Sequence, residues 1–597
     1  MQSTQTYVKV DPAKEPMTVA ELLLYYLELE GVRNIFGVPG AALSYVLNAL
    51  KERQDKFTYH ICRHESGASY MADGFSRVGG KLGVVLVSSG PGATNALTGS
   101  VTALYCYSSV LVISGEVPEH VFGKHSFQEG ADSGLDVSAI YRNANQYSAL
   151  VTDPRNFQTF FTRALRTALS LPRRATHIGL PEDIGGETFA QEIYIPKHPR
   201  NYRAIPSSHD PAAAERVMDI LAKAENPLLF LGNGCRAALL PGSLMSPEER
   251  AATAERMRRF RLLIEKFALP VVTSPNGKGI FPETHAMSLR NYGFGGCQWA
   301  RWYIQATGPA AAAELRYDAL LILGSSLGQK TTDNWDPVLI PFGPLVQVDL
   351  DQSAIGRGFP LDFGVVAEVG AFIDDLIRYG ECMKPNESIV ARRRHLIAEI
   401  RKFPPEPPPQ AFVDELVRCV AELSPRGAHI FVDATTGTEA SLRYMTIDPP
   451  IQMHNAFTME PMGWAAAAVV GAGLADPDAA CIAVTGDGGF MMNGNEVSTA
   501  AQYKVGAVWV VLYNDTLANV ERYLAKEFGG LGWMNLYQLG SPDLATVARG
   551  LGAHAVEVYD IGAFRTAFTD ALTNARMKHQ PQVIVAKLLI GNPDRDG

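Results

Sequence analysis

The sequence predicts an α/β fold in which three open, parallel sheets form successive domains. Short apolar runs rich in β-branched residues recur along the whole chain. Such runs are typical of strands that are buried on both faces of a parallel sheet. Amphipathic helical stretches separate the runs, and this alternation is typical of open α/β sheets. The chain of 597 residues is also too long for one core, since single cores stop growing at about 250–300 residues.

Two linkers divide the chain into three pieces. Residues 197–211 (KHPRNYRAIPSSHDP) are polar and proline-rich, and residues 402–410 (KFPPEPPPQ) form a proline-rich spacer. Length alone suggests roughly four domains, but these breaks predict three domains of similar size. We place them at residues 15–195, 210–380 and 411–597.

Each piece contains candidate strands. They are residues 83–88 (GVVLVS) in the first piece, 228–231 (LLFL) and 319–323 (ALLIL) in the second, and 481–485 (CIAVT) and 507–512 (AVWVVL) in the third. In the first and third pieces, a strand runs into a glycine-rich turn and then a helix start, at residues 89–95 (SGPGATN) and 486–489 (GDGG). Open α/β sheets bind ligands at such carboxyl ends, so we expect two similar domains to face each other across a ligand.

Composition and charge limit the possible classes of function. The chain is 47% hydrophobic and 19% charged, as in ordinary soluble proteins. Its net charge of −9 disfavours binding to nucleic acid or to an anionic membrane surface. The seven cysteines are scattered and contain no C-x-x-C pair, which favours a reducing compartment. No signal peptide is visible, and the apolar run at residues 463–475 is too short to span a bilayer. We therefore expect a cytoplasmic enzyme with small-molecule partners.

Asp487 and Asn514 are the candidate metal ligands. Asp487 follows one predicted strand, and Asn514 follows the next one 27 positions later. A βαβ unit of this length can bring the two strand ends together. Carboxylate and amide oxygens suit Mg²⁺ or Ca²⁺, and Mg²⁺ commonly adds phosphate oxygens. Gly488 and Gly489 would let a diphosphate approach the backbone N–H groups at a helix start. The alternative is that Asp487 merely caps a helix.

This arrangement resembles the G-D-G…N motif of thiamine-diphosphate-dependent enzymes, and five further segments agree with that family. They are residues 36–42 (FGVPGAA), 63–68 (RHESGA), 72–77 (ADGFSR), 89–95 (SGPGATN) and 127–129 (FQE). The segments follow the family's order over nearly the whole chain. Within the family, the chain resembles the branch of acetohydroxyacid synthase and pyruvate oxidase.

The resemblance implies a pyrimidine-binding domain, a central Rossmann-like domain and a diphosphate-binding domain, in that order. It implies that Glu65 hydrogen-bonds the cofactor pyrimidine, so that a nitrogen of the pyrimidine becomes the base in catalysis. The alternative is a surface glutamate that is salt-bridged to Arg63. It also implies that Phe127 and Gln128 line the catalytic pocket, whereas the alternative for these two is core packing and a capping amide.

The remaining cofactor contacts also follow from the resemblance. Mg²⁺ would be held by Asp487, Asn514 and the backbone carbonyl of Thr516. Met462 would be the apolar wedge beneath the cofactor, which positions its reacting groups. Further contacts to thiamine diphosphate would come from Gly488, Gly489, the carbonyl of Glu460 and Thr438.

The chain departs from the acetohydroxyacid synthases at several places. Residues 324–330 (GSSLGQK) stand where those enzymes carry an arginine for the acceptor carboxylate, in a stretch that accompanies FAD. Asn519 and Tyr523 replace a methionine and a tryptophan of that branch, and residues 436–440 (TGTEA) depart from its diphosphate-side motif. Loss of a bidentate guanidinium weakens recognition of a carboxylate. The departures therefore favour an uncharged acceptor and disfavour FAD.

The central piece keeps two turns that can bind a nucleotide, at residues 231–234 (LGNG) and 348–351 (VDLD). A single glycine-rich turn is weak evidence, and the alternative is a Rossmann-like domain without a ligand.

Together these features predict a thiamine-diphosphate-dependent enzyme that decarboxylates a 2-oxo acid and transfers the acyl unit to an aldehyde or ketone. Two alternatives stay open: a C–C lyase or simple decarboxylase, and a catalytically silent regulatory homologue. The presence of Glu65, Asp487 and Asn514 argues against the silent homologue. The resemblance also implies that the cofactor lies between domains of different subunits, so that a homodimer is the minimum and a tetramer is common.

Overall fold

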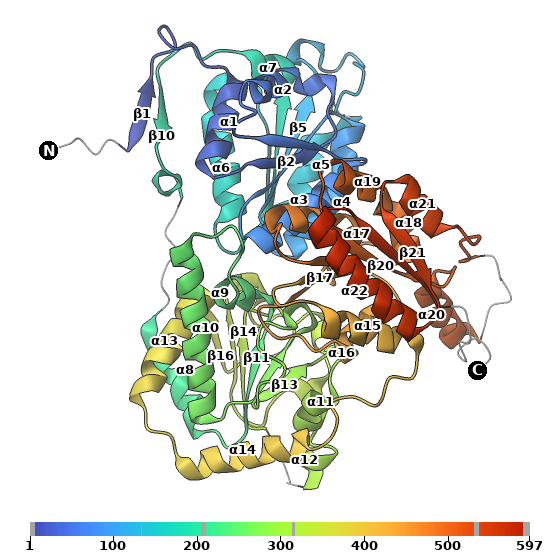
Figure 1. The fold of residues 1–597 in the computed structure, drawn as a ribbon. Coiled ribbons are helices and arrows are strands. Elements are labelled where there is room, and N and C mark those ends of the chain that lie inside the picture. The colour runs from blue at the N-terminus through green and yellow to red at the C-terminus, as the bar shows by residue number, and fades with distance from the viewer. Residues whose placement is uncertain (1–5, 133, 204–209, 313–316, 530–535, 589–597) are drawn as a thin grey trace. The chain divides into compact units, whose positions relative to one another are not determined.

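The computed structural model describes residues 6–132, 134–203, 210–312, 317–529 and 536–588. It contains three six-stranded parallel sheets (Figure 1), which confirms the predicted fold class. The described residues divide into two compact units. The first unit covers the described residues within 1–206, 464–477 and 491–505, and the second covers those within 207–463, 478–490 and 506–597. Residues 133, 313–316, 530–535 and 589–597 of the predicted domain ranges, and residues 204–209 of the predicted linker, lie outside the described residues.

The first sheet has the strand order β3-β2-β4-β5-β9-β8. Its strands are β2 (Asn34–Gly37), β3 (Thr58–Ile61), β4 (Gly83–Val87), β5 (Val110–Glu116), β8 (Tyr147–Leu150) and β9 (Ala175–Pro181). Its helices are α1 (Val19–Leu29), α2 (Ser44–Lys51), α3 (Glu65–Gly79), α4 (Pro91–Tyr105), α5 (Val137–Ala144), α6 (Pro154–Leu169) and α7 (Glu182–Gly186). Two antiparallel pairs accompany it: β1 (Tyr7–Val10) with β10 (Ile193–Pro196), and β6 (Ala131–Asp132) with β7 (Leu135–Asp136). All five residues of β4 are buried, as expected for a central parallel strand.

The second sheet has the order β13-β12-β11-β14-β15-β16, which is the Rossmann order. Its strands are β11 (Pro227–Leu231), β12 (Val271–Thr273), β13 (Ser288–Asn291), β14 (Ala319–Leu323), β15 (Leu345–Asp349) and β16 (Phe363–Val366). Its helices are α8 (Pro211–Lys223), α9 (Arg236–Leu239), α10 (Pro247–Phe267), α11 (Gln298–Gln305), α12 (Pro309–Ala312), α13 (Val369–Cys382) and α14 (Glu387–Arg401). A Cβ atom on Gly232 would lie 2.1 Å from the Gly324 carbonyl oxygen. The glycine-rich turn after β11 therefore lets two loops of the protein pack backbone to backbone.

The third sheet has the order β18-β17-β19-β20-β22-β21. Its strands are β17 (His429–Val432), β18 (Gln452–Asn455), β19 (Cys481–Gly486), β20 (Ala507–Tyr513), β21 (His554–Val558) and β22 (Gln582–Lys587). The helices of this region are α15 (Phe412–Leu423), α16 (Gly437–Tyr444), α17 (Trp464–Ala475), α18 (Asp487–Asn493), α19 (Val497–Gln502), α20 (Ala518–Phe528), α21 (Leu544–Gly550) and α22 (Ile561–Lys578). Counted along the chain, the first and third sheets have the same strand order. The repeated strand–turn–helix pattern in the sequence therefore reflects a repeated topology.

Helix α17 contains most of the small-apolar run at residues 463–475. It packs along α3 within the first unit. A Cβ atom on Gly74 would lie 2.0 Å from the Ala468 carbonyl oxygen, and one on Gly471 would lie 1.9 Å from the Met71 carbonyl oxygen. The small residues thus let two helix backbones come into contact. Across the part of the chain that the structure describes, no helix is both long enough and apolar enough to cross a bilayer.

Candidate functional site

Asp487 and Asn514 meet at the carboxyl edge of the third sheet. Strands β19 and β20 are adjacent and parallel. Asp487 directly follows β19, and Asn514 directly follows β20. The Asp487 carboxylate accepts hydrogen bonds from the backbone N–H groups of Asn514 at 3.0 Å and Asp515 at 2.6 Å. The structure therefore brings together the two residues that the sequence spacing singled out.

The chemistry of this edge suits a hard cation. The Asp487 carboxyl is buried, and burial raises its pKa, while hydrogen bonds from the N–H groups of Gly488, Asn514 and Asp515 oppose that rise. Among the described residues, no group of three or more His, Cys, Asp or Glu side chains could hold a metal ion. A metal here would therefore use the Asp487 carboxylate together with amide and backbone carbonyl oxygens, which Mg²⁺ accepts. The donor set fits the predicted ion.

The two glycines after Asp487 permit close packing of the protein itself. A Cβ atom on Gly488 would lie 2.9 Å from Leu517 Cδ2 and 3.0 Å from Met462 Cε. A Cβ atom on Gly489 would lie 2.8 Å from Asp433 Oδ2. From the sequence, the predicted role of these glycines is only to let a diphosphate approach the backbone. The structure adds a second physical reason, because any larger residue would displace the side chains around it.

Asp433 is a residue of this edge that sequence reasoning missed. It directly follows β17, and 2% of its surface is exposed. Its Oδ2 accepts hydrogen bonds from the Gly463 N–H at 2.9 Å and from the Thr485 hydroxyl at 2.7 Å. It thereby ties the segment before α17 to the end of β19. An acidic residue directly after a buried apolar strand was the available signal.

Glu460, Met462 and Thr438 lie near the same edge, but their side chains have different uses. Glu460 has a left-handed backbone, with φ 49°, and its carboxylate pairs with the Lys330 ammonium. Met462 approaches Gly488, as described above. The buried Thr438 hydroxyl accepts from the Thr435 N–H at 2.9 Å and donates to the Asp433 carbonyl at 2.8 Å. That hydroxyl therefore stabilises the turn between β17 and α16.

Glu65 is the first residue of α3 and is half-buried. The Asn95 side-chain amide, on α4, donates to Glu65 Oε2 at 3.0 Å. A Cβ atom on Gly92 would lie 3.6 Å from Glu65 Oε1. The alternative of a salt bridge to Arg63 is not observed, because the Arg63 guanidinium donates to Ser498 Oγ at 2.6 Å and to other groups around α19. The Glu65 side chain, at the start of α3, is therefore oriented by the Asn95 amide on the neighbouring helix α4.

Glu496 fixes the backbone just before Glu65, and sequence reasoning missed it as well. It is fully buried. Its carboxylate accepts from the backbone N–H groups of Arg63 at 3.1 Å and His64 at 3.0 Å, and from the Thr499 hydroxyl at 2.6 Å. Burial raises the pKa of this carboxyl. Its neighbours at residues 493–499 (NGNEVST) are mostly polar, so no local pattern marked this glutamate as buried.

Phe127 and Gln128 lie on a loop that Glu116 and Glu129 hold, and Glu129 accepts from the Ser126 N–H at 3.1 Å. Glu116 Oε1 accepts from the Val117 and Gly130 N–H groups, each at 2.9 Å. Phe127 is 85% exposed in the single chain, so the alternative of core packing is wrong for this residue. Gln128 is exposed and has a left-handed backbone, with φ 60°, a conformation that is uncommon for residues other than glycine.

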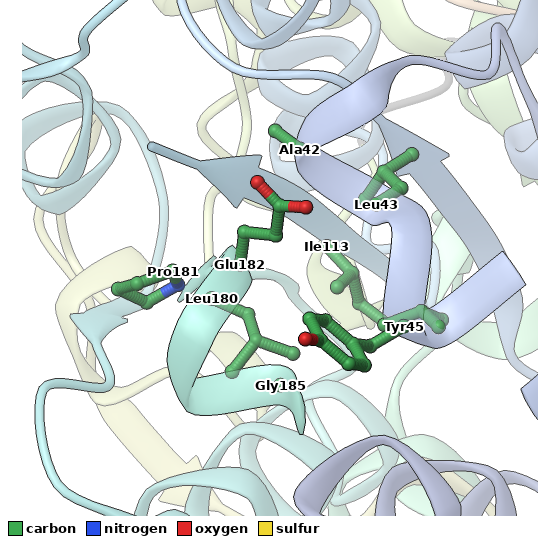
Figure 2. Close-up of a pocket in the computed structure, with 9 residues that line it drawn as sticks. Ala42, Leu43, Tyr45, Ile113, Leu180, Pro181, Glu182 and Gly185 are labelled. Atoms are coloured by element: carbon green, nitrogen blue, oxygen red, sulfur yellow. The ribbon is translucent and has the colours of Figure 1, made fainter. Parts of the chain in front are cut away.

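A separate depression lies in the first unit (Figure 2). Its lining includes Ala42, Tyr45, Ile113, Leu180 and Glu182. It contains none of the predicted site residues, and its lining leaves no room for a bound molecule. We therefore assign it no role.

Comparison with known proteins gives a consistent result over most of the chain. Three family models match in succession: the N-terminal TPP binding domain of thiamine pyrophosphate enzymes at residues 17–135, their central domain at 214–376, and their C-terminal TPP binding domain at 433–586. A Mycobacterium tuberculosis relative named "Putative acetolactate synthase large subunit IlvB2" is 31% identical, over 91% of this chain and 93% of the relative. The acetolactate synthase large subunit of Buchnera aphidicola (strain Sg) is 29% identical over 91% and 90%. The acetolactate synthase isozyme 3 large subunit of Escherichia coli is 26% identical over 94% and 93%.

Proposed function

Because this chain belongs to the thiamine pyrophosphate enzyme family, we propose that it decarboxylates a 2-oxo acid and joins the resulting acyl unit to a carbonyl acceptor. One observation carries the proposal. Asp487 and Asn514 follow two adjacent parallel strands and are joined by a hydrogen bond from the Asn514 N–H to the Asp487 carboxylate, in a chain that also begins α3 with Glu65. Relatives named acetolactate synthase over most of the chain support the same reaction class.

The residues at the third sheet would hold the cofactor and its ion. Asp487, Asn514 and the Thr516 carbonyl would bind Mg²⁺, which in turn binds the diphosphate. The backbone around Gly488 and Gly489 would contact the diphosphate, Met462 would support the cofactor from below, and the Glu460 carbonyl would accept a hydrogen bond from it. When bound, thiamine diphosphate supplies the electron sink for decarboxylation.

Glu65, in the first unit, would hold a proton at a ring nitrogen of the cofactor pyrimidine. Asn95 orients its carboxylate, and Glu496 fixes the backbone before it. Phe127 and Gln128 would close the pocket around the substrate and exclude water, which suits the exposure of Phe127 in the single chain.

We propose an uncharged aldehyde or ketone as the acceptor. Residues 324–330 contain no arginine that could form a bidentate pair with an acceptor carboxylate. FAD is disfavoured because the stretch that accompanies it in the resembling branch is replaced by residues 324–330 (GSSLGQK). A nucleotide at the turns after β11 and β15 stays a prediction. The close contact of Gly232 with Gly324 already explains a glycine at that turn without a bound nucleotide.

We also propose a homo-oligomer, at least a dimer, in a cytoplasmic setting. Large apolar side chains exposed in the single chain support oligomerisation, among them Phe127, Met491 and Met492. Within the described ranges the cysteines form no disulfide, which suits a reducing compartment. Full activity in a monomeric fraction from size-exclusion chromatography would contradict the oligomeric site.

The test is a panel of 2-oxo acids, each combined with aldehydes, with the full-length chain, thiamine diphosphate and Mg²⁺. CO₂ release and product masses are recorded together, with cofactor-free protein as the control. We expect cofactor-dependent CO₂ and a ligated product. CO₂ with only the simple aldehyde would indicate a decarboxylase, and cleavage of the ligated product without CO₂ would indicate a lyase. Absence of every reaction, with the cofactor bound, would indicate a silent homologue.

A further inference from the structure

An ion pair connects the loop after β14 with the segment before α17. The Lys330 ammonium pairs with the Glu460 carboxylate. The two residues are 130 positions apart in the chain. Of their side-chain surfaces, 35% of Lys330 and 28% of Glu460 remain exposed. The pair therefore borders open space and is not part of the core.

Two aromatic rings hold the ammonium in place. Lys330 Nζ lies 4.7 Å from the ring centre of Phe294 and 5.4 Å from that of Phe457. A cation over an aromatic ring is attracted to the ring face. The Phe294 N–H also donates to the Lys330 carbonyl at 2.7 Å. Lys330 is therefore a positioned cation, unlike a lysine that moves freely on a surface.

Glu460 lies at the carboxyl edge of the third sheet, at its switch point. In the strand order β18-β17-β19-β20, the next strand along the chain, β18, lies on one side of β17, and β19 lies on the other side. Open α/β sheets bind ligands at such points. Three residues after Glu460, the Gly463 N–H donates to Asp433 at the end of β17. Between them, Met462 approaches Gly488. The ion pair therefore lies beside the edge that the proposed function uses.

The backbone of Glu460 supports a role for its side chain. Its φ of 49° lies in the left-handed region, which glycine adopts at lower cost than glutamate. A residue other than glycine in this conformation needs support from its surroundings and is a feature of functional sites. Here the Glu460 N–H donates to the Ala456 carbonyl at 2.6 Å, and the side chain pairs with Lys330.

We propose that the Lys330–Glu460 pair selects uncharged acceptors. Glu460 already neutralises the Lys330 ammonium, so an acceptor carboxylate gains no cationic partner there and meets a carboxylate instead. An uncharged aldehyde or ketone is not affected by either charge. The inference rests on the proposed function, because it concerns the acceptor of that reaction.

The test compares two aldehydes that differ by one carboxylate, butanal and 4-oxobutanoate, with a common 2-oxo acid donor. Glu460→Gln removes the competing carboxylate and leaves Lys330 in place. We expect the kcat/KM ratio of 4-oxobutanoate to butanal to rise about tenfold, as for one charge-assisted hydrogen bond gained. The double variant Lys330→Met/Glu460→Gln should return the ratio to the wild-type value. Lys330→Met alone should lower the ratio, since it leaves Glu460 unpaired.

A binding measurement separates this inference from the proposed function. Calorimetric titration of 4-oxobutanoate into the cofactor-loaded protein without donor should show binding about tenfold tighter for Glu460→Gln, and no gain for the double variant. An unchanged ratio and affinity in Glu460→Gln, or a gain that persists without Lys330, would overturn the inference. If the wild type releases no CO₂ from any donor, the proposed function fails, and the titration still decides on the pair. If Glu460→Gln does not fold, an unchanged ratio or affinity in Lys330→Met overturns the inference.

Discussion

The first and third sheets share one strand order but use their carboxyl edges differently. At the third sheet, the Asp487 carboxylate is buried and accepts hydrogen bonds from three backbone N–H groups. At the first sheet, the Glu65 carboxylate is half-buried and meets a side-chain amide at α4. The same topology thus holds a carboxylate fixed and buried in one domain and leaves a carboxylate partly accessible in the other.

The difference shows that the fold supplies positions and the residues at strand ends supply chemistry. In both domains a glycine-rich turn follows a buried strand and starts a helix. Asp487, which begins α18, contacts Asn514 at the end of β20. Glu65, which begins α3, contacts Asn95 on α4. A fixed ligand suits the binding of an ion, whereas an accessible carboxyl suits the movement of a proton.

Glu65→Gln should have the largest effect on turnover. The amide keeps the size of the side chain and its contact with Asn95 but cannot hold the proton in the same way. We expect CO₂ release to fall by about 10²–10⁴-fold, the usual contribution of general acid–base catalysis. Cofactor affinity, measured by quenching of tryptophan fluorescence, should change only a few-fold.

Glu52→Gln is the matched control for Glu65. Its side chain is 69% exposed, and turnover of this variant should equal that of the wild type. Unchanged turnover in Glu65→Gln would remove the catalytic role of Glu65 and, with it, the contrast between the two edges.

Asp487→Ala should have the next largest effect, and it should act on cofactor binding. Without this carboxylate, Asn514 and the Thr516 carbonyl alone supply too few oxygen ligands for the octahedral coordination of Mg²⁺. We expect Mg²⁺-dependent affinity for thiamine diphosphate to fall by about 100-fold or more, since even indirect partners of a metal contribute 10–100-fold. Titrations of cofactor at several Mg²⁺ concentrations measure the effect.

Asp515→Asn distinguishes the ligand from its neighbour. Asp515 accepts hydrogen bonds from Ser541 in this structure and is not a predicted ligand. Its variant should weaken Mg²⁺-dependent binding far less than Asp487→Ala does. Equal losses in the two variants would contradict the assignment of the metal to Asp487.

The sequence predicts the central strands of the fold well, and the reason is burial. Residues 319–323 and 481–485 form continuous apolar runs, and they correspond to β14 and most of β19. Strand β13 shows the limit. All four of its residues are buried, but it includes Arg290, which pairs with Glu283, and Asn291, whose side-chain oxygen accepts from Lys278. No local pattern reveals a buried polar strand, because its partners lie elsewhere in the chain.

The candidate site divides in the same way. Asp487 and Asn514 could be singled out because one βαβ unit holds both, so their spacing carries information. Glu496 and Lys330 could not, because each acts through a contact between distant parts of the chain. The position of Asp433 after a strand was a signal, but it did not reveal the partners Gly463 and Thr485. Lys330 and Glu460 are 130 positions apart, and neither residue alone suggests the other.

Glu496→Gln should have a moderate effect that tests how Glu65 is positioned. The carboxylate accepts from two backbone N–H groups just before Glu65, and an amide cannot accept at both of its ends. We expect the free energy of unfolding to fall by about 1–3 kcal/mol, observed as a lower melting temperature. We also expect turnover to fall about tenfold, because small displacements of a catalytic group reduce rates strongly.

Glu422→Gln is a suitable control for Glu496, since Glu422 is a partly exposed glutamate paired with arginines. Its melting temperature and turnover should match the wild type. A loss of stability in Glu496→Gln with wild-type turnover would make Glu496 purely structural and would leave the orientation of Glu65 to Asn95 alone.

Asn95→Leu should have the smallest effect of the series. Leucine keeps the approximate volume but removes the amide that donates to Glu65 Oε2 at 3.0 Å. One hydrogen bond to a charged acceptor on a half-exposed side chain suggests a loss of turnover of about three- to tenfold, with unchanged cofactor affinity. Thr94→Val is the control, because the Thr94 hydroxyl bonds to the Pro91 carbonyl and not to Glu65.

Asn95→Asp should reduce turnover further than Asn95→Leu, since two carboxylates would then repel at the start of α3. If both Asn95 variants behave as the Thr94 variant does, Glu65 needs no partner within its own domain, and the first sheet supplies only its position.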